Sequence, residues 1–168
     1  MKTTVKKENI TFDYPNQKSK KGKELTFETT LNCSAKEVWK LYQKPSGWLE
    51  NLNPQAKLSP TRDNKKIENW ELNKNYTFIL YMYGFIPFGK HHISFETIDS
   101  DSLIIQSREH GFMVPHWDNY FEINPLTNST CKIKDVLKIQ STGINAIVSS
   151  YAKGVFKAKH KKIARKIE

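Results

Sequence analysis

Cysteine is scarce in this sequence of 168 residues, and long apolar runs are missing. The two cysteines, Cys33 and Cys131, are too few for a disulfide framework or a cysteine-based metal site. The longest apolar run, residues 78–88, has eleven residues, whereas a membrane-spanning helix needs about 20. The opening segment, MKTTVKKENITFDY, has no apolar stretch of the kind found in a secretory signal peptide. We therefore expect a cytoplasmic protein with reduced thiols.

The sequence also lacks the short motifs of several large enzyme classes. It contains no GxGxxG or Walker motif and no GxSxG, which argues against a nucleotide cofactor and against serine-hydrolase chemistry. His91, His110 and His116 could converge at one end of a sheet as a zinc site. However, His110 has the opposite strand parity to His91, and no HExxH motif is present. We expect no cofactor and no metal.

Arginine is rare among the basic residues, since 24 of the 27 are lysine. The net charge of +10 is concentrated at the two ends of the chain. Residues 1–23 carry +5, residues 153–168 carry +6, and the segment between them carries −1. Readout of base edges relies largely on arginine, so sequence-specific nucleic-acid binding is not expected. Two interpretations stay open: solvated ends that favour solubility, or weak contact of these ends with an anionic surface.

Apolar content is sufficient for a folded domain, with 38% hydrophobic and 12% aromatic residues. Residues 1–22 combine charge runs with Pro15 and only scattered apolar residues, which predicts a basic tail. The folded domain is expected over residues 23–168, a length typical of one domain. We expect that deletion of the tail leaves the stability of the domain nearly unchanged.

Hydrophobic periodicity predicts mostly strands between two helical regions. Residues 24–33 alternate as a half-buried strand, and the segment from Ser34 to Glu37 is a capping box that starts a helix ending before Pro45. Trp48 lies in one further short helical turn. Period-two patterns predict strands at 57–62, 66–72, 75–86, 90–98, 102–110, 117–124 and 131–141. A helical pattern then covers residues 145–167, in which Gly154 indicates a close contact with the sheet.

This order of elements resembles the START/Bet v 1-like superfamily, also called SRPBCC. The segments that carry the resemblance are ELTFETTLNCSAKEVWKLYQKPSGW, GFIPFGKHHISFETID, CKIKDVLKI and GINAIVSSYAKGVFKAKHKKIARKI. The resemblance implies an α+β helix-grip fold, in which a curved antiparallel sheet wraps around a long C-terminal helix. It also implies an elongated cavity between sheet and helix, because members bind lipids, sterols or polyketides or cyclise polyketides. No family-wide catalytic residues are carried over to this sequence.

Strand parity indicates which side chains face the helix, because side chains alternate between the two faces of a sheet. The apolar positions define the inner face and bring five polar side chains with them: His91, Ser107, Glu109, Asn119 and Asp135. The assignment is clearest for Asp135, since lysines occupy the opposite parity of its strand. A hairpin between 90–98 and 102–110 places His91 opposite or diagonal to Glu109. The alternative is that a bulge reverses the parity or that these groups lie at a wet rim.

The candidate ligand-binding wall follows from this parity and from the apolar stripe of the last helix. It consists of Phe78, Leu80, His91, Ile93, Phe95, Ser107, Glu109, Trp117, Asn119, Phe121, Asp135, Leu137, Val148, Tyr151 and Val155. Strand 75–86 is apolar on both faces, which leaves homodimerisation open.

Three functions are compatible with the sequence. The first is binding or carriage of a small hydrophobic ligand, lipid-like or polyketide-like, by a protein without enzymatic activity. The second is a cyclase- or hydratase-like enzyme that uses Glu109 or Asp135 as general acid or base, near His91. The third is an interaction module whose basic termini contact anionic surfaces. Contact between an inward acid and a histidine would favour the second.

Overall fold

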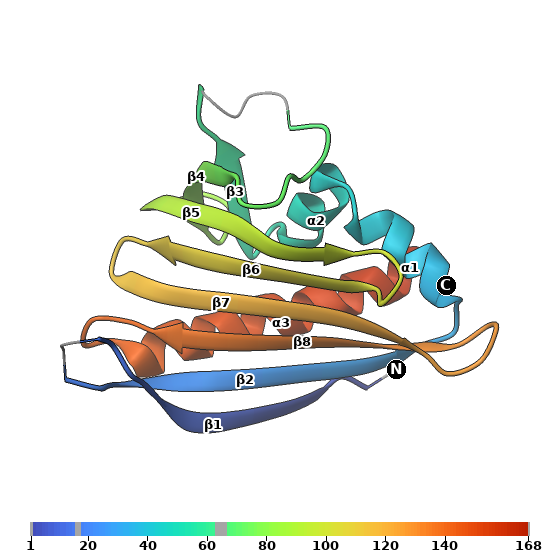
Figure 1. Ribbon diagram of the computed structural model, residues 1–168, viewed down its shortest axis with the longest axis horizontal. Coiled ribbons are helices and arrows are strands. Elements are labelled where there is room, and N and C mark those ends of the chain that lie inside the picture. The colour runs from blue at the N-terminus through green and yellow to red at the C-terminus, as the bar shows by residue number, and fades with distance from the viewer. Residues whose placement is uncertain (1, 16–17, 63–66, 168) are drawn as a thin grey trace.

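The computed structural model describes residues 2–15, 18–62 and 67–167. A single antiparallel sheet holds eight strands in the order β1-β2-β8-β7-β6-β5-β4-β3 (Figure 1). The elements are β1 (Thr4–Phe12), β2 (Lys20–Leu31), α1 (Ala35–Tyr42), α2 (Pro45–Leu52), β3 (Ala56–Pro60), β4 (Asn75–Met82), β5 (Ile86–Asp99), β6 (Ile104–Gly111), β7 (Val114–Pro125), β8 (Cys131–Gln140) and α3 (Asn145–Ile167). The predicted α+β helix-grip fold is confirmed.

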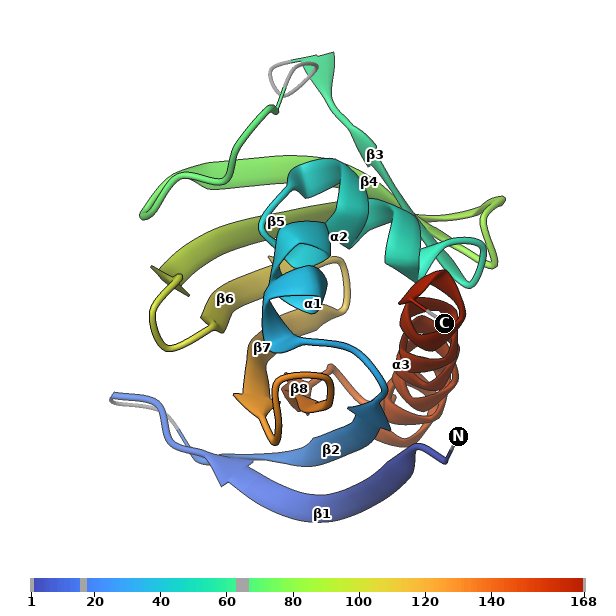
Figure 2. The same ribbon diagram turned by 90° about the vertical axis from the view of Figure 1, so that its right-hand side faces the viewer.

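The sheet forms an arc, and α3 crosses its open side (Figure 2). The two short helices lie between the arc and the end of α3, so that the apolar faces of all elements meet in one core. The stacking of Tyr42 of α1 on Phe121 of β7, with ring centroids 4.0 Å apart, joins the first helix to the sheet.

Local signals in the sequence fix the start of both short helices. The capping box at α1 is formed, because the Ser34 side chain accepts from the Glu37 amide and the Glu37 carboxylate accepts from the Ser34 amide. Pro45 ends α1 as expected and is itself the first residue of α2, where its missing N–H is not needed.

The N-terminal segment differs from the prediction of a tail. Thr4–Phe12 forms β1, which pairs with β2 from Thr4↔Glu28 to Phe12↔Lys20. The ring of Phe12 stacks on His116 at 4.9 Å, and the Tyr14 hydroxyl donates to Gln140 Oε1 at 3.1 Å. An edge strand of this kind needs few apolar residues, because backbone hydrogen bonds hold one side of it and solvent covers the other. The expectation that the folded domain starts at residue 23 is therefore wrong for β1.

Two further expectations are corrected. In the described part of segment 66–72, the backbone forms only a bridge between Leu72 and Phe95, while Trp70 is buried against the core; residues 63–66 lie outside the described residues. Gly154 is exposed, and a Cβ atom built at this position would meet no atom within 4 Å. The close contact with the sheet that the glycine was expected to make is therefore absent from the described structure.

Candidate functional site

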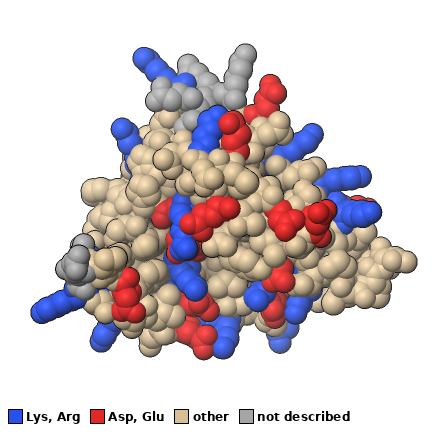
Figure 3. Space-filling model, viewed as in Figure 1, with Lys and Arg blue, Asp and Glu red and all other residues tan. Residues whose placement is uncertain are grey.

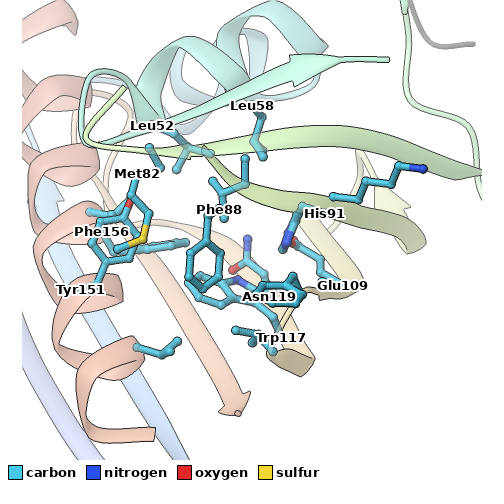
Figure 4. A pocket seen from close by; sticks show the side chains of 18 of the residues that line it. Leu52, Leu58, Met82, Phe88, His91, Glu109, Trp117, Asn119, Tyr151 and Phe156 are labelled. Atoms are coloured by element: carbon cyan, nitrogen blue, oxygen red, sulfur yellow. The ribbon is translucent and has the colours of Figure 1, made fainter. Parts of the chain in front are cut away.

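A cavity lies between the concave face of the sheet and the first half of α3 (Figure 4). Its volume is about 90 Å³, and its walls come from α2, β3 to β7 and α3. Figure 4 shows Tyr151 and Phe156 of α3 on one side and His91 and Glu109 of the sheet on the other. The lining residues are Trp48, Leu52, Ala56, Leu58, Leu80, Met82, Phe88, Lys90, His91, Glu109, Gly111, Phe112, Val114, Trp117, Asn119, Ile144, Ile147, Val148, Tyr151, Val155 and Phe156.

The structure brings together only part of the predicted wall. The predicted residues that line the cavity are Leu80, His91, Glu109, Trp117, Asn119, Val148, Tyr151 and Val155. The others are buried in the core beside it: Phe78, Ile93, Phe95, Ser107, Phe121, Asp135 and Leu137. Parity gives the face of a strand but not the position along it. Phe95, for example, is covered by Trp48 and Trp70, and Phe121 is covered by Tyr42.

At the polar end of the cavity, the lining residues His91 and Glu109 form a hydrogen-bonded chain with Ser107, which lies in the core beside it. His91 Nε2 lies 2.7 Å from Glu109 Oε2, and Ser107 Oγ donates to Glu109 Oε1 at 2.6 Å. All three residues are buried. His91 pairs with Gly111, and Glu109 pairs with Ile93, so the two side chains are diagonal neighbours on β5 and β6, as predicted. The rings of His91 and Trp117 are perpendicular, with centroids 6.2 Å apart.

Asn119 adds a second polar group to the cavity wall. Its side chain is 3% exposed, and its Oδ1 atom has no hydrogen-bond partner among the described residues. A buried amide oxygen without a partner is costly, by about 1–3 kcal/mol, unless water or a ligand supplies the missing donor. Four of the five polar side chains that strand parity assigned to the inner face therefore lie at or next to one end of the cavity.

The fifth predicted polar residue, Asp135, faces inward but lies outside the cavity. Its carboxylate is fully buried and accepts from Lys159 Nζ at 2.8 Å and contacts His160 Nε2 at 2.8 Å. His160 Nδ1 in turn lies 2.8 Å from Thr29 Oγ1. Burial raises the pKa of Asp135, but Lys159 and His160 outweigh burial and hold this pKa below its usual value. The group is a closed structural network.

Sequence reasoning missed the partners of Asp135, although a signal for them was present. Lys159 and His160 are fully buried and lie on the same face of α3 as Phe156 and Ile163, at helical spacing. The ammonium of Lys159 also lies 4.6 Å from the centre of the Phe156 ring. Both residues lie in the segment 153–168, whose net charge of +6 includes Lys159 but not the neutral His160. Of the remaining lysines there, Lys162 donates to the carbonyl of Glu50, so this end of α3 also contacts α2.

Exposed apolar side chains lie on segments that adjoin the cavity wall. Three segments contribute them: the β4–β5 turn, the β6–β7 turn and the first turn of α3. We call this set the apolar rim; its members are Tyr83, Phe85, Ile86, Phe112, Met113 and Ile147, with exposures between 38% and 73%. Phe112 and Ile147 also line the cavity, and Tyr83 lies 5.4 Å from the ring of Tyr151. The rim therefore continues the cavity wall outward.

In contrast to the apolar rim, the convex face of the sheet carries many charged residues, and positive and negative side chains are intermixed on it (Figure 3). Lysines of β8 pair there with acids of the neighbouring strands, as in Lys132–Glu28 at 3.5 Å and Lys134–Glu122 at 3.8 Å. Such partly exposed surface pairs contribute little to stability. On β8 and its two neighbouring strands, lysines and acids of the convex face are therefore paired, in agreement with the near-neutral middle of the sequence.

The histidine and cysteine candidates do not form a common site. His110 stacks on His92 at 4.7 Å on the other face from His91, and His116 stacks on Phe12. Within the described ranges, no group of three or more potential metal ligands is found. Cys33 and Cys131 lie in the core with their sulfur atoms 3.9 Å apart, and burial raises the pKa of Cys131 to about 12.

None of the helices in the described ranges has the length and apolar character needed to cross a membrane. The curved sheet, the two short helices and the long gripped helix define a START/Bet v 1-like fold, and solved structures with this fold align with the chain. A START superfamily protein from Mycobacterium smegmatis aligns with a TM-score of 0.63 at 12% identity, over 86% of this chain and 96% of that one. The Zhui aromatase/cyclase from Streptomyces sp. R1128 aligns with a TM-score of 0.61 at 12% identity, over 86% and 95%.

A third structure is norcoclaurine synthase from Thalictrum flavum in complex with dopamine and hydroxybenzaldehyde. It aligns with a TM-score of 0.58 at 16% identity, over 97% of this chain and 86% of that one. A family model described as a domain of unknown function, DUF8410, matches residues 29–167, and the chain belongs to this family. A search of curated proteins gave no match.

Proposed function

We propose that this protein binds a small, mostly apolar molecule in the cavity, with one polar group of the molecule against His91 and Asn119. The observation that carries the proposal is the asymmetry of the cavity. Its walls are apolar apart from the polar end formed by His91, Glu109 and Asn119 and from Lys90. Ligand sites commonly combine an apolar wall with a few polar groups that fix the orientation of the ligand.

The size of the cavity favours a small ring over a sterol or a long acyl chain. Sites for drug-sized ligands occupy roughly 300–1,000 Å³, whereas this cavity has a volume of about 90 Å³. The structural neighbour norcoclaurine synthase was solved with two molecules that each contain one aromatic ring, which is compatible with a ligand of this size. The expectation of a lipid-like or polyketide-like ligand is thereby narrowed to molecules with about one ring.

Cyclohexanone is a suitable probe, because it combines one apolar ring with one polar oxygen that can accept a hydrogen bond from Asn119 Nδ2. Saturation-transfer NMR should detect its binding to the intact chain. Val148→Phe places a ring in the cavity from α3 and should weaken binding at least tenfold. Val136→Phe adds the same group on the outer face of β8 and is the matched control. Equal binding to both variants and the wild type, with all three folded by circular dichroism, would place the ligand outside the cavity.

A second candidate function is contact with an anionic lipid surface, favoured by the apolar rim. Six exposed apolar side chains lie on three segments that adjoin the cavity wall, whereas isolated exposed apolar residues need no explanation. Exposed Lys18, Lys20 and Lys21 precede or begin β2 near the same end, since the Asn145 side chain at the start of α3 donates to the Lys21 carbonyl at 2.7 Å. Aromatic side chains next to lysines are typical of surfaces that bind anionic lipids.

Sedimentation with phosphatidylserine–phosphatidylcholine vesicles tests this candidate. Phe85→Ser combined with Phe112→Ser should abolish co-sedimentation. The control is Leu72→Ser combined with Leu126→Ser, because these residues are exposed to 52% and 53% but lie outside the rim. Binding should also fall with increasing salt. Loss of binding in both double variants, or a rim-dependent dimer in the absence of vesicles, would contradict lipid contact.

A further inference from the structure

The nitrogen of His91 that does not contact Glu109 is the most notable unused group in the cavity. Ser107 donates to one oxygen of Glu109, so this carboxylate acts as the acceptor of the chain and His91 Nε2–H donates to its other oxygen. The second nitrogen, Nδ1, then keeps its lone pair. Among the described residues, His91 Nδ1 has no hydrogen-bond partner.

Gly111 keeps the space beside this nitrogen open. His91 and Gly111 are paired across β5 and β6, so a side chain at position 111 would project on the same face as His91. A Cβ atom there would lie 3.2 Å from His91 Nδ1 and 2.8 Å from the carbonyl oxygen of Lys90. Gly111 lines the cavity. The lone pair of Nδ1 is therefore next to a part of the cavity that any other residue would fill.

We propose that His91 is a general base that moves a proton within a small cyclic ketone bound in the cavity. The inference rests on the proposed binding function and adds an activity to it. A histidine whose far nitrogen is held by a buried carboxylate is fixed in one tautomer and one orientation, which suits it for proton abstraction. Glu109 and Ser107 are positioning residues, because they act on the ligand only through His91.

The step balances without any co-reactant. For a ketone with a double bond between its β and γ carbons, His91 Nδ1 takes a proton from the α carbon. The C–H bond breaks, an N–H bond forms, and the electron pair moves to the carbonyl oxygen as an enolate. The protonated His91, stabilised by Glu109 at 2.7 Å, then returns the proton to the γ carbon and leaves a conjugated ketone. The Asn119 side chain lines the cavity, and its Nδ2 group can donate to the enolate oxygen, whereas its unpaired Oδ1 is an acceptor and takes no part in this step.

The isomerisation of 3-cyclohexen-1-one to 2-cyclohexen-1-one tests this activity, because the conjugated product absorbs in the ultraviolet. The intact chain should accelerate the reaction above buffer. His91→Gln should lower kcat by about 100-fold or more, the usual contribution of a positioned base. Glu109→Gln should lower kcat while KM stays within about twofold, because both oxygens of Glu109 are already occupied by His91 and Ser107 and make no hydrogen bond to the ketone. His110→Gln changes an exposed histidine on the other face of β6 and should keep the wild-type rate.

The outcomes separate this inference from the proposed binding function. Cyclohexanone cannot isomerise, so its binding by saturation-transfer NMR reports the cavity alone. Binding of cyclohexanone without acceleration of 3-cyclohexen-1-one overturns the role of His91 as a base and leaves the binding proposal standing. An equal rate in His91→Gln and the wild type overturns it too. Absence of binding to either ketone overturns both proposals.

Discussion

The buried network around Asp135 gives the sharpest prediction for stability. Asp135→Asn preserves the shape of the side chain but removes the charge that faces Lys159 at 2.8 Å and His160 at 2.8 Å. Lys159 is 1% exposed, so its ammonium would remain in the core without a counter-charge. Breaking a buried ion pair by removing one partner costs about 3–5 kcal/mol. We expect a loss of this size in the free energy of unfolding, measured by urea denaturation at pH 7.

Two further variants control this prediction. Glu122→Gln removes an acid from the partly exposed surface pair with Lys134, one position along the same two strands, and should cost less than about 1 kcal/mol. Asp135→Asn combined with Lys159→Met removes both charges and should recover at least half of the lost stability. A cost below about 1 kcal/mol for Asp135→Asn alone, or no recovery in the double variant, would refute the account of the network.

The sign of the pH dependence follows from the direction of the two pKa shifts. The pKa of Asp135 in the folded state is lower than its unfolded value of about 3.9, so its contribution is present above about pH 4 and is lost as the pH falls through the folded pKa. Burial lowers the pKa of Lys159 despite the opposing effect of Asp135, so the unfolded chain binds more protons and stability rises with pH toward about 10.4. Without Asp135 this rise should become steeper.

The remaining predictions concern two positions that the sequence did not place correctly. Gly154→Ala should raise the free energy of unfolding by about 0.5–1 kcal/mol, because the added methyl group meets no atom within 4 Å and alanine favours the helix. A lower free energy of unfolding in urea denaturation would show that this position makes a contact. Phe12→Ala should lower the free energy of unfolding by about 1–3 kcal/mol, because the ring stacks on His116 and packs over Gly22. The control Phe85→Ala, at a residue 73% exposed, should change this free energy by less than about 0.5 kcal/mol. Equal effects of the two phenylalanine variants would mean that β1 adds nothing to the fold.

The long helix and the inner face of β8 could be predicted from the sequence, because their hydrophobic patterns repeat over many residues. The α3 stripe of apolar residues extends over more than six turns, and both ends of the helix agree with the prediction. The alternation of Lys132 and Lys134 with Asp135 fixed the inner face of β8 in the same way. β1 has no comparable pattern, since an edge strand is held by its backbone, and its exposed side chains resemble those of a tail.

The candidate site could be predicted only in part, because strand parity applies only inside regular strands. Parity identified His91, Glu109 and Asn119 because each lies inside a regular strand. It could not identify Phe88 or Phe112, which lie at or beside turns, nor show that Asp135 lies beyond the cavity. The position of a residue along a strand relative to a helix depends on the curvature of the sheet, which local sequence does not encode.

The central claim is that the cavity binds the polar end of a small ring next to His91. A titration of the isotopically labelled protein with cyclohexanone, followed in proton–nitrogen and proton–carbon spectra, tests it most directly. We predict saturable shifts of the Trp117 indole N–H, the Asn119 side-chain amide and the His91 ring, together with unchanged signals of Val136 on the outer face. Shifts confined to the apolar rim, with the His91 and Asn119 signals unmoved at saturation, would contradict the claim.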